Sequence, residues 1–126
     1  MKFRTPLARV RGLGSARAGT HHWWMQRLTA IALVPLSIWF VASLISVVSA
    51  DHATVIAWLH SPLVAILCCA LIVATFYHGQ LGVQVVLEDY VHSEWLKLTS
   101  IVLMQLLSLL LAAICLFAVL SIAFRS

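Results

Sequence analysis

Charged residues are scarce in this chain of 126 residues: they make up 10% of it, and only four are acidic. Hydrophobic residues make up 63%, which is more apolar surface than a water-soluble globule of this size can bury. The composition therefore excludes an ordinary water-soluble domain and indicates a protein of the lipid bilayer.

Cysteine is also scarce, and no two of the three cysteines have Cys-x-x-Cys spacing. Cys68, Cys69 and Cys115 lie in apolar segments, where we interpret them as small packing residues and expect neither a disulfide framework nor a thiolate metal site. The chain has neither a glycine-rich dinucleotide fingerprint nor the cysteines of an iron–sulfur cluster. It is therefore not expected to catalyse a redox reaction alone.

Three windows of the sequence contain no charged residue: 28–50, 52–87 and 98–124. A helix needs about 20 apolar residues to cross the hydrocarbon core, so each window is expected to hold one span, and the middle one also a loop. Ser61–Pro62 and Ser93–Glu94 are typical helix starts. We predict an all-α membrane protein with a single membrane-anchor domain over 1–126. It has a basic arm at 1–19 and transmembrane helices at about 20–50, 61–88 and 94–124.

Positive charge is concentrated before the first span, and all but two of the eight cationic residues lie there: Lys2, Arg4, Arg9, Arg11, Arg17 and Arg27. Lys97 lies between the second and third spans, and Arg125 follows the third. The positive-inside rule then predicts a cytoplasmic N-terminus and a periplasmic C-terminus. The net charge of +4 is interpreted as an orientation signal, and no nucleic-acid partner is expected.

The second span contains an unusual polar group, His78, with glycines nearby. Helical periodicity places Ala74, His78, Gly82 and Val85 on one stripe. An ionisable side chain at this depth points to a ligand of a metal or macrocycle, with an interhelical hydrogen bond as the alternative. Gly82 leaves room for a flat macrocycle, although it could equally admit a neighbouring backbone.

The end of the same helix carries Glu88, Asp89 and Tyr90. If the helix continues, Asp89 lies on nearly the same side as His78 and roughly 16 Å further along the axis. Tyr90 could donate a hydrogen bond to the headgroup of a lipid-soluble molecule, and Asp89 could pass protons to it. The alternative is an ordinary interfacial tyrosine beside loop acids.

Arg27 is the last charge before the first span. From its position alone it can extend to the lipid headgroups or face the protein interior.

Two segments, His21–Ala30 and His78–Val91, together resemble the small hydrophobic membrane-anchor subunit of succinate dehydrogenase, respiratory complex II. The resemblance extends over all three spans in order. It is most specific in the Arg-x-Thr-Ala sequence that begins at Arg27 and in the segment from His78 to Tyr90.

The resemblance implies a role for each matching residue. His78 would be an axial ligand of the iron of a haem b, and a second anchor subunit would supply the other axial histidine. Arg27 and His21 would meet the haem propionates, with His22 as the alternative to His21. Asp89 and Tyr90 would belong to the quinone site.

The resemblance also implies partners and a location. The chain would be a non-catalytic anchor that receives electrons from a flavoprotein subunit and an iron–sulfur subunit and helps to reduce ubiquinone. It would lie in the bacterial inner membrane as a multi-pass protein in contact with lipid. Two other functions remain open: an anchor of quinol:fumarate reductase, and a haem-free structural anchor.

Overall fold

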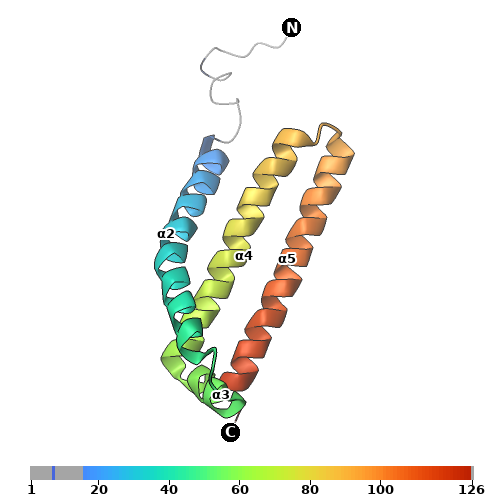
Figure 1. Ribbon diagram of the computed structural model, residues 1–126. Helices are drawn as coiled ribbons and strands as arrows, with labels where there is room; N and C mark the ends of the chain where they lie inside the picture. Colours follow the sequence, from blue (N-terminus) through green and yellow to red (C-terminus); the bar gives the residue numbers. More distant parts are fainter. Residues whose placement is uncertain (1–6, 8–15, 126) are drawn as a thin grey trace.

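The computed structural model describes residue 7 and residues 16–125, and the rest of the predicted basic arm lies outside this part. The described chain is helical, with helices α2 (Ala16–Val47), α3 (His52–His60), α4 (Pro62–Tyr90) and α5 (Glu94–Ala123) (Figure 1). Three of them, α2, α4 and α5, are long and apolar enough to cross a membrane. Because lipid offers backbone groups no hydrogen-bond partner, a helix that satisfies its own backbone is the expected form of each span. The predicted all-α fold with three spans is confirmed.

The first and second spans differ in detail from the predicted ones. The first helix begins at Ala16, before the predicted start near Thr20, and it ends at Val47. It is curved along its length (Figure 1), and Pro35, inside it, lacks the backbone N–H of a regular helical turn. In α4, Pro62 occupies the first helical position as predicted, but Ser61 makes no side-chain capping bond. The helix continues without a break to Tyr90, so Asp89 shares the axis of His78.

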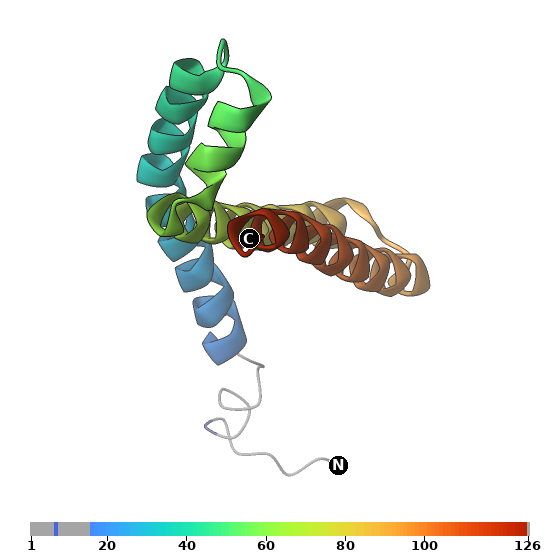
Figure 2. The same ribbon diagram turned by 90° about the horizontal axis from the view of Figure 1, so that it is seen from below.

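A short helix, α3, occupies the segment that was predicted as a loop. Its N-cap is Asp51, whose carboxylate accepts hydrogen bonds from the backbone N–H of Thr54, at 3.1 Å, and from the Thr54 hydroxyl. The ring of Trp58 in α3 stacks on that of Trp39 in α2, with centroids 6.2 Å apart. Seen from below, α3 runs from the end of α2 to the start of α4 (Figure 2), and the Trp58–Trp39 contact holds it against α2.

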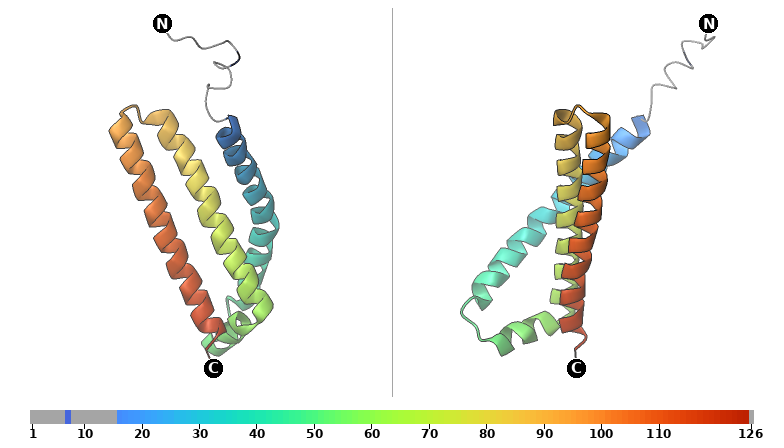
Figure 3. Two further views of the ribbon diagram at one scale, coloured as in Figure 1. Left: turned by 180° about the vertical axis from the view of Figure 1, so that it is seen from behind. Right: turned by 90° about the vertical axis from the view of Figure 1, so that its right-hand side faces the viewer.

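The three spans form an open arrangement in which α4 is central. It contacts both α2 and α5, and α2 crosses it obliquely while α5 runs beside it (Figure 3). The beginning of α2 and the α4–α5 connection lie at one end of the molecule, and α3 and the C-terminus lie at the other (Figure 1). The first span therefore begins and the third span ends at opposite ends of the molecule, as expected for three crossings of a membrane.

Few side chains are buried within the chain. Among the described residues, the buried apolar side chains are Ala65, Cys68, Ala74 and Leu81, all on α4, and the buried polar one is Thr29 on α2. No residue of α5 is buried. The contact of α2 with α4 is therefore the place where a polar group is enclosed by the chain itself.

Candidate functional site

The buried polar contact joins α2 to α4 through Thr29 and His78. The Thr29 Oγ1 and the His78 Nδ1 lie 3.0 Å apart, which is a normal hydrogen-bond distance. Thr29 is 8% exposed, and no described residue forms a hydrogen bond with the other imidazole nitrogen, Nε2. His78 thus has one nitrogen held by the fold and one that remains available.

A cavity of about 430 Å³ opens beside this contact, between α2 and α4. Three of its lining residues, His78, Gly82 and Val85, belong to the stripe predicted from helical periodicity. Ala74, the fourth member of that stripe, is buried. The other lining residues come from α2: His22, Trp23, Gln26, Arg27 and Ala30.

These five residues of α2 form one side of the cavity, the α2 wall. Two of its polar atoms are buried without a hydrogen-bond partner among the described residues: His22 Nε2 and Gln26 Oε1. A buried polar atom normally has a partner, because leaving it unpaired costs on the order of 1–3 kcal/mol. A ligand in the cavity, or a group from another chain, would supply that partner. The α2 wall therefore has the chemistry of a surface that is completed from outside this chain.

The two glycines of α4 have different surroundings. A methyl group added at Gly82 would meet Gln26 Nε2 at 3.8 Å, an ordinary contact, and one added at Gly79 would meet nothing within 4 Å. Neither glycine is needed to admit a neighbouring backbone of this chain. The space at Gly82 belongs to the cavity that His78 lines.

Arg27 lines the same cavity, and its guanidinium carbon lies 5.6 Å from the centroid of the Trp23 ring. This is the distance of a cation–π contact between two residues that both line the cavity. His21 is exposed and is not among the lining residues, whereas His22 is. The role predicted for His21 stays a prediction.

Asp89 and Tyr90 lie outside this cavity, in the last turn of α4. Both are exposed, and Tyr90 is 79% exposed. Of the neighbouring polar groups, Glu88 accepts a hydrogen bond from Gln84 at 2.8 Å. The structure therefore places the predicted quinone residues, Asp89 and Tyr90, at a different level of α4 from His78.

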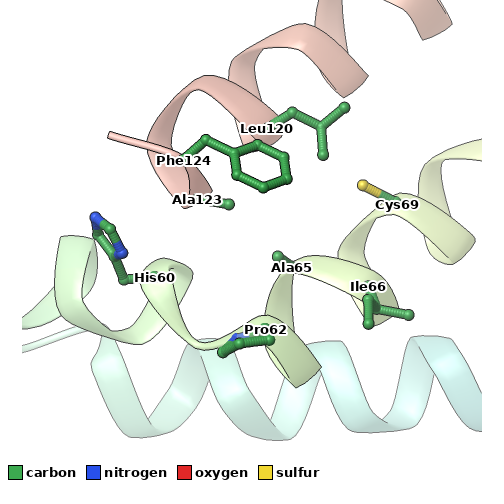
Figure 4. A pocket seen from close by; sticks show the side chains of 8 residues that line it. All are labelled: His60, Pro62, Ala65, Ile66, Cys69, Leu120, Ala123 and Phe124. Atoms are coloured by element: carbon green, nitrogen blue, oxygen red, sulfur yellow. The ribbon is translucent and has the colours of Figure 1, made fainter. Parts of the chain in front are cut away.

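A second cavity, of about 320 Å³, lies at the other end of the molecule, between the start of α4 and the end of α5. Leu120 of α5 and Phe124, the residue after α5, face Ala65 of α4 across it (Figure 4). Its lining is apolar apart from His60 and the Cys69 thiol. The cavity at His78 carries more polar groups, including two histidines, a glutamine and an arginine, so it is the candidate site.

Sequence reasoning did not assign roles to Thr29 and Gln26, although both lie near His22 on α2. The spacing of residues 22, 26 and 29 is the i, i+4, i+7 pattern of one helix face. That pattern was visible in the sequence as a polar stripe at the start of an apolar span. Its partner on α4 was not visible, since no sequence pattern fixes how α2 crosses α4.

Comparison with known proteins now gives the family. The model of the succinate dehydrogenase/fumarate reductase transmembrane subunit matches residues 1–122. The succinate dehydrogenase hydrophobic membrane anchor subunit of Rickettsia bellii is 36% identical over 108 residues, which cover 86% of each chain. The subunit of the same name from Rickettsia conorii is 32% identical, covering 82% of this chain and 83% of the relative. That from Paracoccus denitrificans is 27% identical, covering 71% and 70%.

These matches, with three apolar spans, fit a multi-pass bacterial membrane protein that anchors a complex and has no catalytic role of its own. The chain belongs to the family of succinate dehydrogenase/fumarate reductase transmembrane subunits, as a membrane anchor subunit of succinate dehydrogenase.

Proposed function

We propose that this anchor holds one side of a haem b that it shares with a companion cytochrome b anchor subunit, and that it forms part of the ubiquinone-reduction pocket. One observation carries the haem proposal: His78 lines a polar cavity, with Nδ1 held by Thr29 and Nε2 free of hydrogen bonds to the described residues. Neutral imidazole with one free nitrogen is the usual axial ligand of haem iron.

The residues around the cavity suit a haem. His78 Nε2 would bind the iron, and the absence of a side chain at Gly82 leaves space for the edge of a flat ring. Arg27 and the unpaired His22 Nε2 would donate hydrogen bonds to the propionates, because cationic and N–H donors suit carboxylates. The cavity favours His22 over the exposed His21 for this contact. A bound haem would supply a centre that accepts and releases one electron.

A second axial ligand is expected from the companion subunit. A haem shared between two chains, each giving one histidine, suits the open α2–α4 wall and its unpaired atoms. The iron–sulfur and flavoprotein subunits would bind at the end of the molecule that carries the α4–α5 connection.

The quinone role belongs to the last turn of α4. Tyr90 would donate its phenol hydrogen to a carbonyl oxygen of ubiquinone, and Asp89 would relay protons from water. Reduction to ubiquinol takes two electrons, which succinate supplies through the flavin and the iron–sulfur clusters, and two protons. Exposure of Tyr90 supports this role, since its hydroxyl is free to meet a ligand held by neighbouring subunits.

We further propose that the N-terminus is cytoplasmic and the C-terminus periplasmic, in the bacterial inner membrane. The support is the concentration of cations between Lys2 and Arg27, together with the position of the beginning of α2 and of the α4–α5 connection at the same end of the molecule (Figure 1).

The test is purification of the complex from detergent-solubilised membranes through an affinity tag on this chain. We expect flavin, iron–sulfur protein and a second anchor to co-purify, with succinate-driven reduction of ubiquinone and a b-type visible spectrum. A complex with flavin but no haem would contradict the haem role and leave a structural anchor. Activity found mainly as fumarate reduction by quinol would assign the chain to the reverse reaction.

A further inference from the structure

Thr29 combines burial with an unusual number of hydrogen-bond partners. It is the buried polar side chain of the described part of the chain, at 8% exposed. Its Oγ1 lies 2.7 Å from the carbonyl oxygen of Met25, 3.1 Å from that of Gln26 and 3.0 Å from His78 Nδ1. The three partners surround a hydroxyl that has a single proton to give.

The proton count assigns the direction of each bond. A carbonyl oxygen can only accept, so the hydroxyl proton of Thr29 goes to the nearer carbonyl, that of Met25. The lone pairs of Oγ1 then face His78, and the bond at 3.0 Å requires a proton on Nδ1. If Thr29 donated to His78 instead, Oγ1 would lie 2.7 Å from a carbonyl oxygen with no proton between them.

We propose that Thr29 is the positioning residue of the haem site: it holds His78 in the tautomer with the proton on Nδ1 and leaves the Nε2 lone pair for the iron. This role rests on the proposed haem function. A histidine ligand usually donates its second N–H to a carboxylate, a carbonyl or water, and that partner sets ring orientation and basicity. Here the hydroxyl oxygen of Thr29 accepts it, which fixes the orientation of the ring.

The helix itself does not require this hydroxyl. A threonine that bonds to the carbonyl four residues earlier slightly destabilises and bends a helix, and a valine of the same shape would fill the same space between α2 and α4. The contact between helices that valine could not make is the hydrogen bond with His78. Removing it would leave Nδ1–H unpaired and would free the ring to rotate.

The test compares Thr29→Val with Thr29→Ser in the intact complex, and Thr99→Val is the control. Thr99 is exposed on α5, so it undergoes the same chemical change away from the site. We measure the haem-to-flavin ratio and the midpoint potential of the haem in a redox titration. Thr29→Val is expected to weaken haem binding by about 10- to 100-fold and to raise the potential of any haem retained, because a less basic imidazole favours the oxidised iron less.

Thr29→Ser keeps the acceptor and should restore both values toward those of the wild type, and Thr99→Val should change neither. If valine at this contact prevents assembly, Thr29→Ala makes the same comparison without the branched side chain. A haem-loaded wild type whose ratio and potential are unchanged in Thr29→Val would overturn the role of Thr29 alone. A wild-type complex without haem would overturn the proposed haem function and this role with it.

Discussion

At the scale of single residues, α4 carries two kinds of polar group at two depths. His78 lies in the middle of the helix and faces the α2 wall, while Asp89 and Tyr90 lie in its last turn and are exposed. At a rise of 1.5 Å per residue the two positions are roughly 16–18 Å apart along the axis. One helix would thus support an electron-transfer group and a quinone pocket at different levels of the membrane.

Tyr90→Phe isolates the proposed quinone contact, because it removes one hydroxyl and keeps the ring. We expect succinate oxidation with an artificial electron acceptor to be unchanged and ubiquinone reduction to fall on the order of tenfold, the effect of one lost hydrogen bond of about 1.4 kcal/mol. Tyr77→Phe, on the same helix but in the middle of the span, is the control. Unchanged ubiquinone turnover in Tyr90→Phe would remove this hydroxyl from the mechanism.

Gly82→Ala distinguishes an effect on the stability of α4 from an effect on the space in the cavity. Alanine favours a helix by about 1 kcal/mol over glycine, and its methyl group would make only an ordinary 3.8 Å contact with Gln26. The chain should therefore assemble at least as well as the wild type, yet the haem-to-flavin ratio should fall because the methyl occupies the cavity. Gly79→Ala, with nothing within 4 Å, should keep the wild-type ratio. Equal haem content in the two variants would show that the space at Gly82 is not used.

At the scale of helices, the stripe of His78, Gly82 and Val85 could be predicted, because helical periodicity is a local property of the sequence. The Thr29–His78 bond could not, since it joins residues 49 positions apart and depends on the angle at which α2 crosses α4. The predicted helices at about 20–50, 61–88 and 94–124 differ from α2, α4 and α5 by only a few residues at each end. Helix ends were less predictable: the Ser61 and Ser93 side chains make no capping bonds.

The helix α3 was missed for a different reason. It has only nine residues, His52–His60, and it lies within the long uncharged window that was predicted to contain a loop. Its local signal was Asp51, whose carboxylate caps the backbone N–H of Thr54, but an aspartate is equally common in a turn. Packing of Trp58 on Trp39 supplies the tertiary contact that no local pattern reports.

The cap of α3 should be sensitive to acid. Hydrogen bonds from the Thr54 hydroxyl and backbone N–H hold the pKa of Asp51 below its ordinary value. A carboxylate whose pKa is lowered by folding stabilises the helix above its unfolded pKa and loses that effect as the pH falls through its folded pKa. As the pH falls through the pKa that Asp51 has in the folded protein, the hydrogen-exchange protection factor of the Thr54 amide should therefore decrease modestly.

Asp51→Asn provides the matched control, because asparagine caps a helix about as well as aspartate and does not titrate over this range. Its Thr54 protection should be nearly independent of pH, and Asp51→Ala should lose protection at every pH. A pH dependence that persists unchanged in Asp51→Asn would assign it to another group.

At the scale of the whole molecule, the chain buries very little of itself. The buried side chains are confined to α4 and Thr29 among the described residues, and α5, which contacts α4 and α3, has no buried residue. Large apolar side chains are normal on a lipid-facing surface, but the unpaired polar atoms of the α2 wall are not. These features fit an anchor subunit of a complex, in which a neighbouring chain or a bound group would close the polar cavity.

The composition predicted only that the chain is a membrane protein, because it has too few charged and too many hydrophobic residues for a water-soluble domain. It did not indicate which face would be open, because burial depends on the arrangement of α2, α4 and α5 together. The family assignment supplies the anchoring role, and the cavity supplies the place where the haem would bind.

The most direct measurement is a dithionite-reduced minus oxidised visible spectrum of the purified complex, recorded for the wild type, His78→Ala and His60→Ala. His60 lies at the other end of the molecule and lines the apolar cavity there, so it controls for the loss of a histidine. We predict a b-type band in the wild type and in His60→Ala that is lost or shifted in an assembled His78→Ala complex. An unchanged band in His78→Ala would contradict the account.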